Sequence, residues 1–529
     1  MHPLFFSCKL LKHNNMKKLL SFLIVALALM PLLSKAQSTT TNGPKLELDE
    51  TALTYILDDN DDILRIFSME RGFFYEDIVI SKYNKRTHVV TEQVVDEDFE
   101  GRFVFLTNDN TTVNLVRCIL NKKTHKLEFQ KASFPVDVKV PKKLVFTTMC
   151  YFPAEKIKEK YQTFGAFNAD RSKFAVVTMP YPDRDQPRKP VYVAVFDDTG
   201  ELLFGESKVV ECYPFFHMDN INVAMDGTVY VTKYGSEYDN SSFMHILTCS
   251  EHGIFNYSET FENDEHFTCK QMVKPNGDLC VVGIKGKKGD SECKLMTYTA
   301  TPDGNVDFVD QDITLSDDFE GKKYDDGNLA EDKQPLIPHL FDLIQLSNGD
   351  FLLVGEMRKR MQIGSFTKTA SNGVTWEYPT FGFLSHNMYY LKVGIDGSLR
   401  GMNVYQRATV SSEDGGRWLD SNPVYAFEYD GDAYLIYNDN RANYKRGGMQ
   451  SLLCNRPDQC SVILSKIEGN GELSSTIIYD AKTKFKDPQM ISQQWNHEYF
   501  LKPLHQTDDG IYYILKHDGE YRLEKITIE

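Results

Sequence analysis

The sequence predicts an all-β protein built from repeated four-stranded antiparallel sheets, and two observations support this fold class. The first is a recurring Asp-Gly or Asn-Gly pair, which suits the tight turns of β-hairpins because both residue types tolerate positive φ. It occurs in MDGTVYV (225–231), PNGDLCVV (275–282), PDGNVDFV (302–309), SNGDFLLV (347–354), IDGSLRG (395–401), YDGDAYLI (429–436), GNGELS (469–474) and DDGIYYIL (508–515). The second is that the turns alternate between two kinds, each with its own following strand.

The two kinds of turn place the strands of each repeat in the order a to d. One kind joins strand a to strand b, an almost continuous apolar run, as at 229–231 and 279–282. Such runs are typical of strands buried on both faces. The other kind joins strand c to a mixed strand d, as expected of an outer edge strand. The hairpin 193–205 (VAVFDDTGELLFG) has a turn of this second kind, so we expect Asp197 and Asp198 to be turn residues.

Six repeats can be traced from about residue 160 to the C-terminus, and residues 45–150 offer one or two weaker ones. Repeated four-stranded units are typical of β-propellers. We therefore predict one propeller domain in residues 45–529, built from four-stranded antiparallel blades. We expect seven or eight blades, and the pattern allows six to eight. The last repeat stops after its third strand, so we expect an N-terminal strand in 44–50 (PKLELDE) to close the ring. A tandem of β-sandwiches is the alternative architecture.

In its turn and strand pattern the chain resembles β-propeller proteins as an architecture. More loosely, it resembles exported bacterial propeller proteins of unassigned function. The resemblance covers most of the chain and has no WD, kelch or quinone-enzyme signature to narrow it.

Residues 1–36 have the pattern of a secretory signal peptide. Lys17 and Lys18 precede the apolar run 19–33, and Ser-Lys-Ala follows it. The apolar run is shorter than a membrane span, and Met16 is an alternative start. We expect residues 37–44 to be a short linker. We also expect an exported protein without a transmembrane segment in the mature chain, located in the periplasm, at the cell surface or outside the cell.

Charge and cysteine content narrow the function further. The chain carries 59 basic and 75 acidic residues, a net charge of −16. Such an acidic chain would repel phosphate backbones, so we expect no nucleic-acid partner. Ten cysteines show no C-x-x-C spacing, and we expect neither a metal nor a cofactor. Cys454 and Cys460 are a candidate disulfide, with two free thiols as the equal alternative.

The long connections should all lie on one face of the propeller. They are the b-c insertions 356–387 and 437–460 and the d-a connections 312–340, 411–423 and 481–499. Insertions gathered on one face commonly mark the binding face. Basic and aromatic side chains there suit a protein partner or an anionic or glycan ligand, although long loops also use such residues to pack on themselves. The candidate ligand-binding residues are Arg358, Arg360, Trp376, Tyr378, His386, Trp418, Asn440, Arg441, Tyr444, Arg446 and Trp495.

No catalytic residue is predicted. The stretches 369–376 (TASNGVTW) and 412–418 (SEDGGRW) are similar to the sialidase Asp box, but Thr369 and Ser371 replace its Ser and Asp, and the tryptophan of the second stretch comes one residue early. Both should be turns in the insertions. The preferred function is therefore an exported binding protein, not an enzyme. A carbohydrate-active hydrolase or lyase is the alternative.

Overall fold

The structure is a computed structural model, and its described residues are almost all in β-strands. The one described helix is α2 (Arg441–Lys445). The described residues are 38–46, 53–58, 62–70, 76–84, 86, 89–96, 102–106, 111–135, 144–154, 161–180, 188–211, 220–236, 242–262, 264–287, 292–315, 337–369, 375–412, 424–445, 453–454, 459–468, 472–480, 489–490, 505–507, 510–517 and 520–528. The predicted signal peptide lies outside them.

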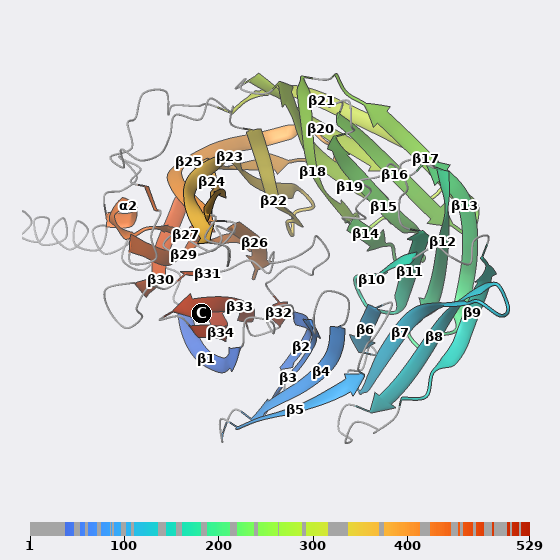
Figure 1. The fold of residues 1–529 in the computed structure, drawn as a ribbon. Helices are drawn as coiled ribbons and strands as arrows, with labels where there is room; N and C mark the ends of the chain where they lie inside the picture. The colour runs from blue at the N-terminus through green and yellow to red at the C-terminus, as the bar shows by residue number, and fades with distance from the viewer. Residues whose placement is uncertain are drawn as a thin grey trace, which may run out of the picture.

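Eight sheets, antiparallel except for one short added strand, follow one another around a ring, as Figure 1 shows, and we call them blades 1 to 8. Blade 1 comprises β2 (Leu53–Asp58), β3 (Asp62–Glu70), β4 (Glu76–Asn84) and β5 (Val89–Asp96), and blade 2 comprises β6 (Arg102–Leu106), β7 (Thr112–Asn121), β8 (Lys126–Pro135) and β9 (Thr147–Pro153). Blade 3 comprises β10 (Tyr161–Phe167), β11 (Lys173–Pro180), β12 (Arg188–Asp197) and β13 (Leu202–Glu211), and blade 4 comprises β14 (Asn220–Val223), β15 (Val229–Ser236), β16 (Ser242–Ser250) and β17 (Gly253–Thr260).

The second half of the ring carries the insertions. Blade 5 comprises β18 (Glu265–Val273), β19 (Leu279–Lys287), β20 (Glu292–Ala300) and β21 (Val306–Thr314), and blade 6 comprises β22 (Ile337–Gln345), β23 (Phe351–Thr369), β24 (Thr375–Val393), β25 (Leu399–Ser412) and the added β28 (Leu453–Cys454). Blade 7 comprises β26 (Val424–Tyr429), β27 (Asp432–Asn440), β29 (Cys460–Ile467) and β30 (Leu473–Asp480), and blade 8 comprises β31 (Gln489–Met490), β32 (His505–Thr507), β33 (Gly510–His517), β34 (Glu520–Ile528) and β1 (Ser38–Leu46).

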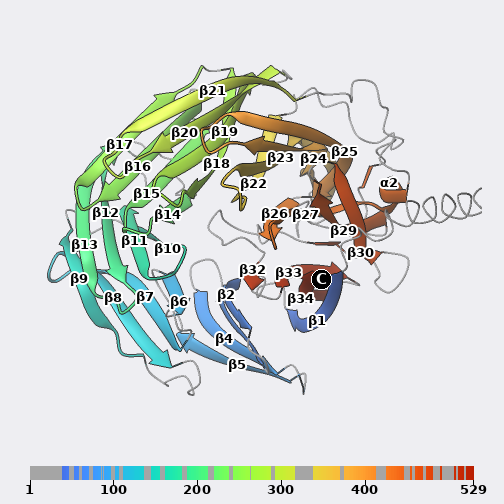
Figure 2. The same ribbon diagram turned by 180° about the vertical axis from the view of Figure 1, so that it is seen from behind.

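This arrangement confirms the predicted β-propeller and sets the number of blades at eight. Seen from either side, the a strands such as β14 and β22 lie toward the centre, and the d strands such as β13 and β17 lie outermost (Figures 1 and 2). The six repeats traced from the sequence are blades 3 to 8, and the two weaker units are blades 1 and 2. A tandem of β-sandwiches is excluded, since consecutive sheets follow one ring.

The N-terminal strand closes the ring. β1 pairs antiparallel with β34, from Ser38 opposite Ile528 to Leu46 opposite Tyr521. The closing strand thus begins at Ser38 and includes residues that we expected to form a linker. Its Ser-Thr-Thr-Thr start favours extended backbone, and pairing removes the exposed edge that β34 would otherwise present.

The core is divided among the interfaces between neighbouring blades. Residues 174–180 of β11 are buried without interruption, as expected for a b strand covered on both faces. Val177 and Val193 of blade 3 belong to one apolar cluster with Val229 and Leu247 of blade 4. Comparable clusters join the later neighbours up to blades 7 and 8. Among the described residues, apolar clusters therefore join each pair of neighbours from blade 3 to blade 8.

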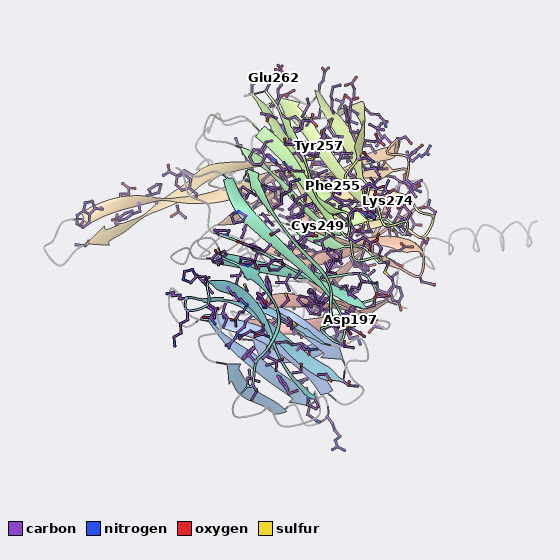
Figure 3. The ribbon with its side chains drawn as sticks, turned by 90° about the vertical axis from the view of Figure 1, so that its right-hand side faces the viewer. Asp197, Cys249, Phe255, Tyr257, Glu262 and Lys274 are labelled. Carbon is purple, nitrogen blue, oxygen red and sulfur yellow. The ribbon has the colours of Figure 1, made fainter. Side chains whose placement is uncertain are left out.

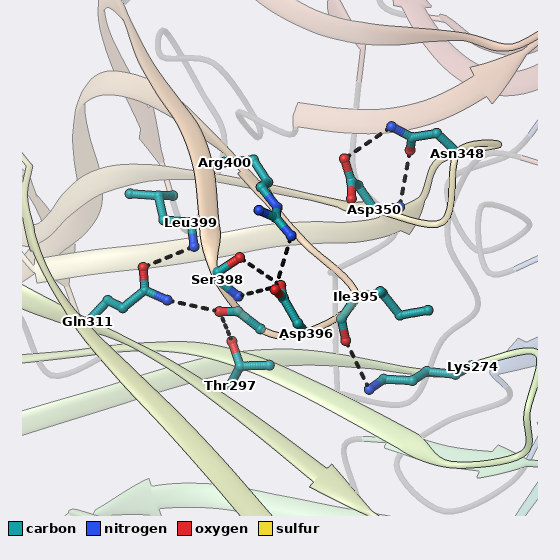
Figure 4. Close-up of polar contacts among 11 residues, drawn as sticks. Lys274, Thr297, Gln311, Asn348, Asp350, Ile395, Asp396, Ser398, Leu399 and Arg400 are labelled. Atoms are coloured by element: carbon teal, nitrogen blue, oxygen red, sulfur yellow. Dashed lines mark hydrogen bonds and ion pairs between the residues drawn. The ribbon is translucent and has the colours of Figure 1, made fainter.

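The short turns form one face of the ring and are tied to adjacent blades. The Tyr230 hydroxyl of blade 4 donates to the Gly277 carbonyl of blade 5 at 3.0 Å. Between blades 5 and 6, the Gln311 amide donates to the Gly397 carbonyl at 3.2 Å and accepts the Leu399 N–H at 3.0 Å, as Figure 4 shows. Lys274 reaches the Ile395 carbonyl in the same turn. The short turns therefore serve the ring as inter-blade contacts.

Asp197 illustrates the acidic residues in these turns. One of its carboxylate oxygens accepts the backbone N–H groups of Thr199 and Glu201, at 3.0 and 2.8 Å, and the Thr199 hydroxyl. Burial alone would raise the pKa of Asp197, but these hydrogen bonds outweigh it and hold the pKa below its usual value. Asp197 thus stabilises a hairpin, as its sequence context predicts.

Candidate functional site

The insertion of blade 6 is a long β-hairpin. β23 and β24 pair along their whole length, from Phe351 opposite Val393 to Thr369 opposite Thr375. We expected residues 356–387 to be a loop, and this expectation was wrong, because their Thr, Ile, Phe, Trp and Tyr residues favour strands. Figure 3 shows the hairpin projecting far from the ring, away from the short turns that carry Lys274 and Asp197.

The outer half of this hairpin has only two strands. β22 follows β23 as far as Arg358, and β25 follows β24 as far as Gly382. We call residues 360–369 and 375–381 the ribbon. In the part of the chain that the structure describes, no third strand pairs with the ribbon. An isolated two-stranded sheet is at best marginally stable in water. The ribbon therefore differs from the other blades, each of which has at least four strands.

The two faces of the ribbon differ in chemistry. Paired residues share a face, and the register sets Phe366 opposite Tyr378 and Lys368 opposite Trp376. Trp376 and Tyr378 are 47% and 42% exposed. We call the face that carries Trp376 and Tyr378 the aromatic face. The other face is polar, and there the Ser365 hydroxyl donates to the Glu377 carboxylate.

A β-bulge lies where the hairpin leaves the blade. The pairing of β24 shifts register next to Asn387 on both sides, between Glu356 and Met357 of β23 and between His386 and Met388 in β24. Asn387 is buried and has a φ of 38°, a conformation that asparagine tolerates better than most residues. Bulges bend the strands that contain them, so this one sets the direction of the ribbon.

A buried charge cluster lies beside the bulge and joins two blades. Arg407 of β25 interacts electrostatically with Glu356 of β23 and Asp439 of β27, and each of the three is 1% exposed. Glu356 accepts a hydrogen bond from the Ser385 hydroxyl. Asp439 accepts hydrogen bonds from the Tyr405 hydroxyl of blade 6 at 3.2 Å, and from the Asn440 N–H and the Asn443 side-chain amide that follow it in the chain. The cluster therefore fixes the base of the hairpin to blade 7.

Burial controls the ionisation of both carboxyl groups. It raises the pKa of Asp439 to about 6, although Arg407 and the hydrogen bonds from Asn443, Asn440 and Tyr405 act in the opposite direction. Burial likewise raises the pKa of Glu356, against Arg407, Arg358 and the hydrogen bond from Ser385. Ionisation of these groups is costly, and Arg407 is the cation that offsets this cost for both.

Sequence reasoning missed this cluster. Its members lie on three strands of two blades, and no local motif links them. The available signal was a charge in an otherwise apolar b strand, as at Glu356 after FLLVG and Asp439 after YLIYN.

Arg358, one of the predicted ligand contacts, is bound within the hairpin base. Its Nη1 lies 3.1 Å from Nε2 of His339, and its guanidinium lies 3.7 Å from the ring centroid of Phe383. Burial, helped by Arg358, lowers the pKa of His339, so the imidazole is neutral and can accept this hydrogen bond. Arg358 therefore has a structural role.

The other predicted residues divide into three groups. Trp376 and Tyr378 are exposed together on the aromatic face. Asn440 is 9% exposed, and its side-chain oxygen accepts the Ala442 N–H at 2.9 Å, so it caps α2. Arg441 is partly buried at the start of α2. Arg360, His386 and Tyr444 lie on β23, β24 and α2, with side chains outside the described set, and Trp418, Arg446 and Trp495 lie wholly outside it.

Of the two cysteines in the candidate disulfide, the structure describes the side chain of Cys460 alone. It is a buried free thiol, and its sulfur lies 3.8 Å from the Ser461 carbonyl oxygen. Cys454 lies on β28, which pairs in parallel with β25 of the preceding blade. Within the described residues, no group of three His, Cys, Asp or Glu side chains could hold a metal ion, and no helix there is long and apolar enough to cross a membrane.

Comparisons with known proteins identify no family and no particular activity. No family model and no curated protein matches the chain. Among solved structures it is similar to the WD40 domain of SCAP from fission yeast, with 9% identity, TM-score 0.36, and 93% of this chain and 98% of that chain covered. It is also similar to the Dos1 propeller, with 8% identity, TM-score 0.33, and 77% of this chain and 93% of that chain covered. A third similar structure is an α-L-arabinanase of Penicillium chrysogenum, with 11% identity, TM-score 0.27, and 80% of this chain and 98% of that chain covered. At these TM-scores the likenesses say nothing about function.

Proposed function

We propose that this protein is a binding protein in which the propeller is a rigid ring and the ribbon contacts a protein partner. The observation that carries the proposal is the ribbon itself. It projects from the ring as two strands, with Trp376 and Tyr378 nearly half exposed on one face. Tryptophan and tyrosine supply much of the binding energy in protein interfaces. Contact with a partner would also stabilise an element that is marginal alone.

The rest of the hairpin supports this assignment. The bulge at Asn387 directs the ribbon, and the Glu356–Arg407–Asp439 cluster holds its base against blade 7. A rigid base lowers the entropy lost when the ribbon binds. On the opposite face of the ring, the short turns make hydrogen bonds between blades, such as that from the Tyr230 hydroxyl to the Gly277 carbonyl.

The alternative functions have less support. Glu356 and Asp439 are both 1% exposed, so the carboxylates at the hairpin base do not favour a carbohydrate-active hydrolase or lyase. Arg358 forms a hydrogen bond with His339 and a cation–π contact with Phe383, so it does not support an anionic or glycan ligand. We also propose that the protein is exported, on the basis of the signal-peptide pattern in residues 1–36.

Site-specific photo-cross-linking tests the binding role. A photoreactive amino acid replaces Tyr378 on the ribbon, or Ile395 in a short turn of the same blade. The two side chains are comparably exposed, at 42% and 55%, so they sample solvent similarly. In extract of the producing cells, we expect a discrete adduct from position 378 and none from position 395. The same products from both positions, or none from 378, would refute the proposal.

A further inference from the structure

Strand β23 presents one long edge of the ribbon. β22 pairs with it only up to Arg358, whereas β23 continues to Thr369. No described strand pairs with the outer side of residues 360–369, which span roughly 33 Å at strand spacing. The N–H and C=O groups on such an edge can pair with a further strand.

The two edges of the ribbon are not equivalent. β24 contains Pro379, which has no N–H to donate, and prolines on edge strands block pairing. Residues 360–369 of β23 contain no proline, and beyond a bulge at Ile363 its residues 364–369 pair with β24 in unbroken register. The β23 edge is therefore the one suited to strand addition.

Charge indicates what kind of strand would fit. Residues 360–369 include the basic residues Arg360 and Lys368 and no acidic residue, although the chain has a net charge of −16. Two copies of this strand would place like charges near one another, and such cross-strand pairs are destabilising. An acidic strand would place opposite charges there instead. The charge pattern thus disfavours a second copy of β23 and favours an acidic partner.

The same chain already stabilises two blades by added strands. β1 completes blade 8 by pairing with β34, although it comes from the other end of the chain. β28, from the insertion of blade 7, pairs in parallel with β25 of blade 6 at Ala408 and Thr409. A strand added to the ribbon would make it three-stranded, which with an apolar face is the smallest independently stable sheet.

We propose that residues 360–369 of β23 accept an acidic, extended segment of a protein partner as an added β-strand. This inference rests on the proposed binding function and specifies the chemistry and backbone geometry of the partner. Main-chain hydrogen bonds would supply affinity, and the basic side chains of β23 would select acidic sequences.

Synthetic peptides test the inference directly. The probe is a fluorescein-labelled peptide of alternating glutamate and valine, and its matched controls are a lysine–valine peptide and the glutamate–valine peptide N-methylated at every residue. The methylated peptide keeps the charge but has no N–H to donate. Fluorescence polarisation should show binding of the unmodified acidic peptide alone. Equal binding of the methylated peptide would reduce the interaction to charge attraction and overturn the inference.

Charge-reversal variants locate the binding site. In the Arg360→Glu/Lys368→Glu variant, affinity for the acidic peptide should fall about tenfold or more, because two opposite-charge contacts become repulsive. The Lys122→Glu/Lys123→Glu variant changes net charge equally in the exposed b-c turn of blade 2 and should bind normally. Equal loss in both variants would contradict binding at β23.

The outcome separates this inference from the proposed function. If position 378 forms its adduct but the acidic peptide does not bind, strand addition is wrong and the binding role stands. If neither is seen, both fail. Dimerisation of the purified protein that Arg360→Glu/Lys368→Glu abolishes would identify a second copy as the occupant and overturn the acidic-partner assignment.

Discussion

Removing Arg407 should destabilise the protein in a manner that depends strongly on pH. In the Arg407→Met variant, Asp439 would remain buried without its cation and would have to take up a proton, while Glu356 would keep only Arg358 as a nearby cation. Asp439 has a pKa of about 6 beside Arg407. Keeping it protonated therefore costs about 1.4 kcal/mol at pH 7 and about 2.7 kcal/mol at pH 8, from 1.36 kcal/mol per pH unit.

The sign follows from proton linkage. A carboxyl group whose pKa is raised in the folded state favours folding below its unfolded pKa and loses that contribution as pH rises through the folded value. For Asp439 in the wild type this loss is complete a little above pH 6. In the variant the pKa would be higher still, so stability would continue to fall above pH 6. Glu356, whose pKa is also raised by burial, adds to the effect in the same direction.

Urea denaturation followed by tryptophan fluorescence at pH 5, 6, 7 and 8 measures the difference. We expect little difference between wild type and Arg407→Met at pH 5, and a loss of about 2 to 5 kcal/mol at pH 8. A variant that also carries Glu356→Gln and Asp439→Asn has no carboxyl group to titrate there and should show no such trend. An equal loss at pH 5 and pH 8 would refute the assigned role of Arg407.

Three further substitutions test the ring and its turns by the same denaturation assay. Gly304→Ala should cost about 1 to 3 kcal/mol more than Gly277→Ala, because both glycines have positive φ but only at Gly304 would a Cβ lie 2.3 Å from the Phe255 side chain; equal costs would contradict this packing. Tyr230→Phe should cost about 1 to 2 kcal/mol by removing its bond to the Gly277 carbonyl, and no loss would mean that this inter-blade bond is dispensable. Asp197→Ala should cost about 1 kcal/mol at pH 7 and less as pH falls from about 4, the unfolded-state pKa, through the lower pKa of the folded protein; a cost that grows in acid would contradict the lowered pKa.

Turn chemistry explains why so much of the ring could be predicted. Gly227 and Gly397 adopt φ values of +99° and +82° in hairpin turns where the sequence places Asp-Gly. Continuous apolar runs such as Phe174–Val177 became buried b strands. These signals are local, because a turn needs positive φ and a doubly covered strand needs apolar residues at every position. The predicted closing strand was also confirmed, although its start at Ser38 was missed since no local signal separates a threonine-rich strand from a linker.

The sequence by itself determined the repeat and the alternation of short turns and long insertions. Only the tertiary structure decided that the insertion of blade 6 is a projecting ribbon, that Arg358 forms a hydrogen bond with His339, and that Glu356, Arg407 and Asp439 form one buried cluster. The physical reason is range. Backbone preferences act over a few residues, whereas pairing beyond a blade and neutralisation of buried charge depend on strands that only the closed ring brings together.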